Sequence, residues 1–359
     1  MKTAFVALLL TTSSTPVSAL SQHDTFPTKS SNFDHQFGNV LILDHLNINH
    51  EKGRHDWLKA FYFDFLQCVP DPRKAENLEK GKKTLWANIG AHQFHLPEGK
   101  PKAQLLEGIV TLAFPDIDTV KGRFEEARTQ LKGSQFHLKE SDNETQLVVD
   151  PWGNLFRLVH GDVTELDERG VQDGGPSKGL SMRDLTIYTP FKANMDGIAR
   201  FYEQLIGCPI LSKSLEVCCV SVGPKQTLTF RWHPEGKAIV QHEDLRDDLI
   251  EPPDGCPSFL SNYGPHVSMY VADLEATYKR VDALNLAYVN PRFSRRAYNL
   301  EQALDDFLFR CLDIVDPENV EAGSILKLEH EIRSCIKPNG SKYKSCPFHE
   351  IPDQVSRPK

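Results

Sequence analysis

The phrase "HLPEGK" (His95–Lys100) returns as "WHPEGK" (Trp232–Lys237) later in the same chain of 359 residues. A second pair follows in the same order, since "EGIVTLAFPDID" (107–118) matches "GPHVSMYVADLE" (264–275). Ordered matches of this kind indicate an internal duplication. The chain therefore reads as two copies of one unit, and this duplication decides the predicted fold.

Further matches extend the duplication over most of the chain. They join "ILDHLNI" (42–48) to "MRDLTIY" (182–188), and "DPWGNLFRLVHG" (150–161) to "DP…GSILKLEHE" (316–331). The offset between matching segments grows toward the C-terminus. The second copy is therefore predicted to carry insertions, at 238–258 and 295–309.

Each copy alternates strand-like and helix-like segments. In the segment 39–49, Leu46 and Ile48 fall on one face of a strand, and His45 and Asn47 fall on the other. The next segment, 55–68, has aromatic residues four apart, as in an amphipathic helix. Helices are also predicted within 116–133, 196–207 and 273–284. Each copy thus reads twice as a strand, a helix and further strands, which predicts an α+β fold.

The N-terminus differs from the rest of the chain. Lys2 precedes an apolar run, and Val17 and Ala19 have the spacing of a signal-peptidase site, so residues 1–19 are predicted to be a removed signal peptide. Residues 20–38 are polar and are predicted to be a disordered leader or a second targeting element. The expected destination is the secretory pathway, with a plastid reached through a bipartite leader as the alternative. No later segment is apolar for long enough to span a bilayer.

The predicted domain boundaries follow from the duplication and from composition. A Gly- and Asp-rich stretch between the copies is expected to be a linker, and the last residues are a polar, proline-containing tail. The segments are copy one at 39–161, the linker at 162–179, copy two at 180–332 and the tail at 333–359.

Composition limits the classes of function. An apolar content of 40% with 25% charged residues is ordinary for a globular protein. The net charge of −8 argues against a general phosphate-binding surface, so no nucleic-acid partner is expected. The eight cysteines contain no Cys-x-x-Cys zinc pattern. Cys335 and Cys346 flank a polar segment and could form a disulfide in an oxidising compartment.

Four stretches carry a resemblance to a known family. They are "LDHLNI", "ARFYEQLIGCPIL", "PHVSMYVADLEATYKRV" and "VVDPWGNLFRLV". The chain resembles the vicinal oxygen chelate superfamily, which includes glyoxalase I, extradiol dioxygenases, and fosfomycin and bleomycin resistance proteins. The resemblance covers about 40–160 and 180–332. It implies four βαβββ modules that form two domains with cupped sheets. A cup in this family holds a divalent metal through one residue from each of four strands, and the metal chelates two neighbouring oxygens of a substrate.

The resemblance also assigns positions to the ligands. Copy one offers His45, His95, Ile109 and Arg157, and copy two offers Asp184, Trp232 (or His233 after a one-residue slip), His266 and Lys327. The family usually has glutamate in the fourth position. Arginine and protonated lysine have no lone pair to give to a metal. Neither copy alone therefore keeps a full set of ligands.

Some relatives build their sites across the two copies. That pairing would join His45 and His95 to His266, and Glu329 would supply the carboxylate if the register shifts by two residues. The metal would be iron, zinc, nickel or manganese. The opposite pairing, of Asp184, Trp232, Ile109 and Arg157, cannot bind a metal. A set of Asp184, His233 and His266 remains an alternative for non-haem iron.

The resemblance implies a glyoxalase- or dioxygenase-like protein that acts on, or binds, a small oxygenated molecule. If it is an enzyme, it would be a metal-dependent lyase, isomerase or dioxygenase. The alternative is a metal-free binding or sequestering protein of the bleomycin-resistance type. The residues expected to contact a small-molecule ligand are Arg157, Lys327, Trp232 and Asp184. The two cations could bind an anionic group of that ligand or pair with internal acids.

Overall fold

A computed structural model describes the chain over residues 38–81, 84–99, 102–142, 144–162, 177–242, 264–290, 293 and 296–356. The predicted signal peptide, nearly all of the predicted leader and most of the predicted linker lie outside these residues. No helix among the described residues is both long and apolar enough to cross a membrane.

The four predicted βαβββ modules are all present, and the α+β class is confirmed. The first module contains β1 (Val40–Asn47), α1 (His55–Leu58) with a π-helical continuation (Lys59–Phe65), β2 (Val69–Pro70), α2 (Ala75–Lys80), β3 (Thr84–Ile89) and β4 (His92–Pro97). The second contains β5 (Gly108–Phe114), α3 (Ile117–Gly122), α4 (Phe124–Gln130), β6 (His137–Ser141), β7 (Thr145–Val149) and β8 (Leu155–His160).

Copy two repeats this order. The third module contains β9 (Ser181–Thr189), α5 (Met195–Arg200) with a π-helical continuation (Phe201–Ile206), β10 (Ile210–Lys213), β11 (Val217–Gly223) and β12 (Gln226–Trp232). The fourth contains β13 (His266–Val271), α6 (Leu274–Asp282), β14 (Ala287–Tyr288), α7 (Leu300–Asp306), β15 (Leu308–Val315), a 3₁₀ turn (Val320–Ala322) and β16 (Ser324–Ser334).

Local sequence signals explain where the helices begin and end. Asp116 caps α3, because its side chain accepts hydrogen bonds from the backbone N–H groups of Asp118 and Thr119. Asp273 caps α6 in the same way through Ala276. The helical segment after β9 ends at Gly207, whose φ of 84° lies in the left-handed region that favours glycine. The predicted helices are therefore confirmed, with the one at 116–133 divided between α3 and α4 at Arg123.

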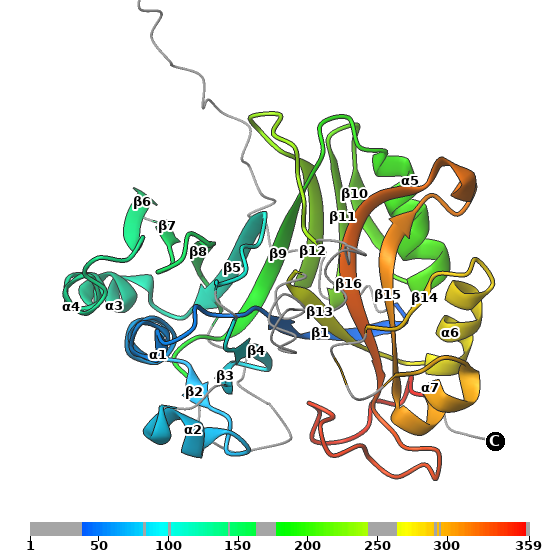
Figure 1. The fold of residues 1–359 in the computed structure, drawn as a ribbon, viewed down its shortest axis with the longest axis horizontal. Coiled ribbons are helices and arrows are strands. Elements are labelled where there is room, and N and C mark those ends of the chain that lie inside the picture. The colour runs from blue at the N-terminus through cyan, green and yellow to red at the C-terminus, as the bar shows by residue number, and fades with distance from the viewer. Residues whose placement is uncertain are drawn as a thin grey trace, which may run out of the picture.

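The strands form two mixed sheets of eight strands each. The first sheet has the order β14-β15-β16-β13-β1-β4-β3-β2, and the second has the order β10-β11-β12-β9-β5-β8-β7-β6. Figure 1 shows α1, α3 and α4 on one side of the molecule and α5, α6 and α7 on the opposite side, with strands between them. The sheets thus form the centre of the molecule, and helices cover its flanks.

Each sheet joins one module of copy one to one module of copy two. In the first sheet, β1 of the first module pairs with β13 of the fourth in antiparallel orientation. In the second sheet, β5 of the second module pairs with β9 of the third. The cross-copy pairing is therefore the arrangement that the chain adopts, and any site in a cup takes residues from both copies.

The two sheets share one core. The aromatic residues that follow α1 reach both sheets, since Phe61 lies 5.0 Å from Phe156 of β8 and Tyr62 lies 5.2 Å from Phe94 of β4, measured between ring centroids. The side-chain amide of Gln226 on β12 pairs with the backbone N–H and C=O of Leu43 on β1. Burial of these large apolar side chains holds the sheets together.

Cleavage of the chain in the predicted linker 162–179 should leave the two halves associated, because both sheets contain strands from each half. We expect a protein cut at a protease site inserted there to elute as one species on size exclusion in native buffer. The halves should separate only in denaturant. Separate elution in native buffer would contradict the cross-copy sheets.

The predicted polar tail, 333–359, is folded over residues 335–356. Cys335, Ile336 and Tyr343 pack against Leu41 and Ile42 of β1 in a second, smaller core. Cys335 and Cys346 both lie in this core as free, buried cysteines. The tail therefore lies against the first sheet, close to its strand β1.

Candidate functional site

Backbone register brings four predicted site residues onto neighbouring strands of the first sheet. Asn47 of β1 lies opposite both His95 of β4 and His266 of β13. His266 in turn lies opposite Glu329 of β16. His45 is two residues from Asn47 along β1, so its side chain points to the same side of the sheet. The structure therefore gathers His45, His95, His266 and Glu329 on one face.

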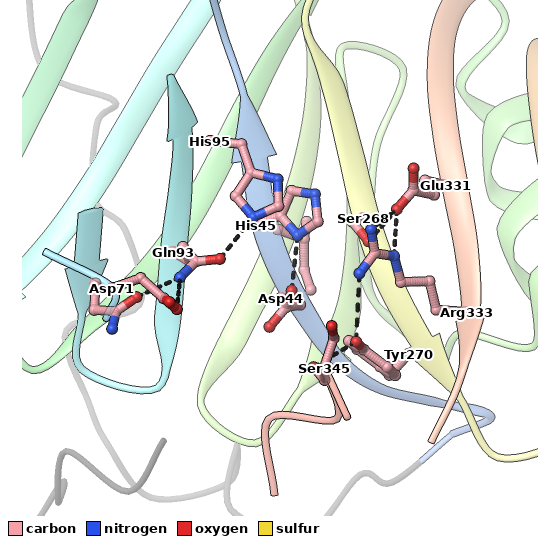
Figure 2. A network of polar contacts seen from close by, with 12 residues as sticks. Asp44, His45, Asp71, Gln93, His95, Ser268, Tyr270, Glu331, Arg333 and Ser345 are labelled. Carbon is pink, nitrogen blue, oxygen red and sulfur yellow. Dashed lines mark hydrogen bonds and ion pairs between the residues drawn. The ribbon is translucent and has the colours of Figure 1, made fainter. Parts of the chain in front are cut away.

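The imidazole of His45 has a fixed orientation and one available lone pair. Its Nδ1 lies 2.7 Å from a carboxylate oxygen of Asp44, so Nδ1–H donates and Nε2 keeps its lone pair (Figure 2). Nε2 is buried and has no hydrogen-bond partner among the described residues. Burial lowers the pKa of His45, although the Asp44 carboxylate opposes this effect. His45 is therefore a neutral imidazole with an unused acceptor.

His266 lies beside His45 and is also neutral. Their ring centroids are 5.9 Å apart and the rings meet edge to face. Burial lowers the pKa of His266 to about 3, against the opposing charge of Glu329. Its side chain is 2% exposed. Two neutral buried imidazoles in contact are the form of histidine that binds a metal.

His95 is held differently. Its ring is stacked between His45, at 3.6 Å, and Trp86, at 4.5 Å, between ring centroids. Its Nε2 lies 2.6 Å from Oε1 of Gln93, whose amide nitrogen donates to Asp71 at 2.8 Å. Since the Gln93 amide is oriented in this way, His95 Nε2 carries the proton and donates it. Figure 2 shows this chain of contacts running from Asp71 to His95.

Arg310, which is buried, and Arg333, which is partly buried, balance two buried glutamates on β16. Arg310 donates to Glu329 at 2.6 Å and also pairs with Glu331, and Arg333 pairs with Glu331 from the other side. Burial opposes ionisation of Glu329, but His242 at 3.6 Å and Arg310 outweigh it and lower its pKa to about 2. The same balance holds the pKa of Glu331 well below its usual range. Both carboxylates are therefore ionised.

The three histidines lie at a cavity of about 720 Å³. His45, His95 and His266 contribute to its wall together with Glu331, Arg310 and Arg333, while Trp86, Phe293 and Tyr343 supply apolar surface. The tail takes part through Tyr343, Lys344 and Ser345. The volume is within the range of small-molecule sites. The predicted cup therefore has room for a small organic ligand.

The donor groups fit a divalent metal in type, and two of them fit in position. Imidazoles that share a metal at a bond length of about 2.1 Å have ring centres about 5 Å apart. The 5.9 Å between His45 and His266 is close to this value, whereas the 3.6 Å between His45 and His95 is too short. Among the described residues, no three His, Cys, Asp or Glu side chains are arranged to hold a metal. His95 and Glu329 would have to exchange their present partners to join the set.

The second sheet has a different interior. Asp184 accepts hydrogen bonds from the hydroxyls of Thr186, Thr227 and Thr229 at 2.5–2.7 Å. Burial raises the pKa of Asp184, while these bonds and the charge of Arg157 oppose the rise. Thr111 lies opposite both Asp184 and Arg157. The three hydroxyls therefore satisfy the Asp184 carboxylate, whereas the buried Oγ1 of Thr111 has no hydrogen-bond partner among the described residues.

The register corrects the fourth ligand position. Glu329, and not Lys327, lies opposite His266, and Leu155, and not Arg157, lies opposite Ile109. Lys327 instead lies near Asp313, with 3.8 Å between its Nζ and the carboxylate, and both side chains are about one-third exposed. A carboxylate, and not a cation, therefore lies opposite His266 in the first sheet.

The two matching phrases, "HLPEGK" and "WHPEGK", do not occupy equivalent positions in their sheets. His95 lies within β4, opposite Asn47, while Trp232 is the last residue of β12 and lies opposite Thr189. The residue of β12 that corresponds to His95 is Thr229, because it lies opposite Thr186, the counterpart of Asn47. Trp232 donates its indole N–H to the backbone C=O of Ala193. His233 lies next to it at the end of the second sheet, so the structure does not bring Asp184, His233 and His266 together.

Several residues of the site carry no strong signal in the sequence. Arg310 lies on β15, outside the segments that match between the two copies, and Gln93 and Asp71 act through His95. Glu331 and Arg333 could have been found from Glu329, because residues two and four positions further along a strand share its face. Tyr343, Lys344 and Ser345 lie in a segment that reads as a polar tail.

Comparison with solved structures finds similar chains at low sequence identity. A proposed dioxygenase from Bacillus subtilis has a TM-score of 0.45 at 13% identity, covering 83% of this chain and 86% of its own. Glyoxalase I from Zea mays has a TM-score of 0.45 at 11% identity, covering 83% and 93%. A fosfomycin resistance protein from Mesorhizobium loti has a TM-score of 0.25 at 15% identity, covering 34% and 94%.

No protein-family model matches the chain, and none of the curated proteins matches it. At these identities and TM-scores the likeness concerns the architecture alone. The assignment of four βαβββ modules rests on the strand order itself.

Proposed function

We propose that the cavity of the first sheet binds a small oxygenated molecule at a divalent metal held by His45 and His266. The observation that supports this most directly is the buried Nε2 of His45, which has no hydrogen-bond partner among the described residues. The contact of Nδ1 with Asp44 sets the tautomer of the imidazole ring and leaves the lone pair on Nε2. A histidine that binds a metal usually donates its other ring N–H to a carboxylate in this way.

The protein's own residues would complete the site. Glu329 lies opposite His266 and is ionised, so it is the carboxylate that we assign as a third ligand. Its present partners are Arg310, at 2.6 Å, and Asn290, at 2.6 Å. Arg310 holds Oε1 and Asn290 holds Oε2, so one of the two partners would have to release its oxygen to a metal. A bound metal with open positions polarises the oxygens that it chelates and stabilises negative charge on them.

A metal-free binding protein is the second candidate, and a different observation favours it. The hydrogen bond of His95 to Gln93 and the ion pair of Arg310 with Glu329 already occupy groups that a metal would need. In that case the cavity would hold its ligand by aromatic contacts and hydrogen bonds alone. The two candidates differ in metal content and share the same cavity.

Titration with Mn²⁺, Ni²⁺, Zn²⁺ or anaerobic Fe²⁺ separates the two candidates. We expect one equivalent of metal per chain, measured by calorimetry and by elemental analysis after desalting. His45→Ala and His266→Ala should each weaken binding at least about a hundredfold, since each removes one ligand. His137→Ala, at an exposed histidine of β6, is the matched control. No binding of any of these metals would favour the metal-free protein.

A further inference from the structure

The charge of the cavity is opposite to that of the chain. The whole protein has a net charge of −8. The cavity is lined by two carboxylates, Asp44 and Glu331, against five cationic side chains. These are Arg73, Lys74, Arg310, Arg333 and Lys344. A cation-rich cavity in an acidic protein concentrates anions.

Three of the five cations are already paired. Arg310 and Arg333 bind Glu331, and Arg73 binds the carboxylate of Asp71 through two nitrogens. Lys74 and Lys344 have no ion pair with any described carboxylate; Lys74 lies 5.2 Å from the ring centroid of Trp86. The two lysines therefore supply the excess positive charge.

The two segments that carry the lysines are hydrogen-bonded to each other at the wall of the cavity. Arg73, the neighbour of Lys74, donates from Nη1 to the hydroxyl of Ser345, the neighbour of Lys344, at 3.0 Å. The backbone C=O of Ser345 also accepts from the hydroxyl of Tyr270 at 2.6 Å (Figure 2). These bonds fix the tail next to the loop before α2. The hydrogen bond between their sequence neighbours, Arg73 and Ser345, therefore holds the backbone segments of the two lysines together.

We propose that this cavity takes a small organic anion whose charged group lies at Lys74 and Lys344 and whose body lies along Trp86, toward the histidines. The proposal deepens the proposed function, because it uses the same cavity and names the class of ligand. The aromatic wall favours a body with a flat apolar part, since Trp86, Phe293 and Tyr343 all line the cavity. The anionic group is a carboxylate or a phosphate, which ammonium groups bind alike.

A pair of fluorescent probes tests the charge of the ligand. 8-Anilinonaphthalene-1-sulfonate is anionic, and N-phenyl-1-naphthylamine has the same aromatic body without the charge. We expect the anionic probe to bind with one equivalent per chain. The K74Q/K344Q double variant should bind it about tenfold more weakly or worse, because it loses two charge-assisted contacts. Binding of the neutral probe should not change.

The matched control is K52Q/K132Q, at two exposed lysines away from the cavity. It removes the same charge from the chain and should leave both probes unaffected. The proposal is overturned if the anionic probe does not bind, if K74Q/K344Q leaves its affinity unchanged, or if the control weakens it equally. Near-ultraviolet circular dichroism of both variants checks that the fold is intact.

Displacement of the bound anionic probe then identifies the charged group. Mandelate tests a carboxylate, phenyl phosphate tests a phosphate, and methyl mandelate is the neutral control. Displacement by either anion and not by the ester supports the proposal, and the stronger competitor gives the class. Displacement by neither anion, or equally by the ester, contradicts it. Metal titration of K74Q/K344Q should be unchanged, so failure of the metal proposal and failure of this one are separable.

Discussion

Arg310→Leu should lower the free energy of unfolding by about 3–5 kcal/mol, measured by denaturant titration at pH 7.5. Arg310 is 5% exposed and neutralises both Glu329 and Glu331 on the neighbouring strand. The variant leaves two buried carboxylates with less positive charge beside them to neutralise them. One of them, Glu331, keeps Arg333, while Glu329 keeps only Asn290 and the more distant His242. Removal of one partner of a buried ion pair is far more costly than loss of a surface pair.

Two further variants check the cause. Arg54→Leu breaks an ion pair with Asp56 at the surface and should cost no more than about 1 kcal/mol. R310L/E329Q should be more stable than the sum of the two single variants predicts, since the second change removes one uncompensated charge. A loss of less than about 1 kcal/mol in Arg310→Leu would show that the cluster is not desolvated as the structure has it.

Acid should destabilise the metal-free protein well above the pH at which carboxylates titrate. Burial lowers the pKa of His50 to about 4, of His330 to about 4 and of His266 to about 3. The unfolded chain binds protons at these residues near pH 6.5, and the folded chain does not. The stability that these neutral histidines contribute is therefore fully present above pH 6.5 and is lost as the pH falls from 6.5 toward 4. His50 alone accounts for about 3 kcal/mol, at about 1.4 kcal/mol per pKa unit.

Unfolding free energies at pH 7.5, 5.5 and 4.5 measure this dependence. His50→Asn should reduce the slope between pH 6 and 4.5 by about one proton, whatever its effect at pH 7.5. His137→Asn, at an exposed residue, should leave the slope unchanged. A free energy that stays constant from pH 7.5 to pH 4.5 would mean that these histidines are not buried in the neutral form.

Much of the fold could be predicted because the relevant signals are local. Aromatic residues four apart mark the helical segment at 55–65, and Asp116 and Asp273 cap the helices that follow β5 and β13. The duplication then predicts that the same order of elements occurs twice. These patterns act over a few residues and do not depend on which strand becomes a neighbour.

The cross-copy sheets could not be decided from the sequence. The pattern within β1 is the same whether it pairs with β5 of its own copy or with β13 of the other copy. The choice depends on long-range packing, such as the bonds of Gln226 to the backbone of Leu43. The sequence therefore supplied the pairing of His45 and His95 with His266 as one of several possibilities.

The carboxylate of the site shows the same limit on a smaller scale. Lys327 and Glu329 are two residues apart on β16, so alternation places both on one face and does not choose between them. The register opposite His266 makes the choice, and it selects Glu329. The hairpin phrases mislead for the same reason, because their letters match at a three-residue offset from the strand register.

The most direct test of the proposed metal centre is the visible absorption spectrum of the protein titrated with Co²⁺ under anaerobic conditions. Imidazole and carboxylate ligands in a site of low coordination number would give intense bands that saturate at one equivalent of Co²⁺ per chain. The account predicts these bands in the native protein and in His137→Ala, and their loss in both His45→Ala and His266→Ala. A spectrum of hydrated Co²⁺ in the native protein, or bands that survive in both cavity variants, would contradict it.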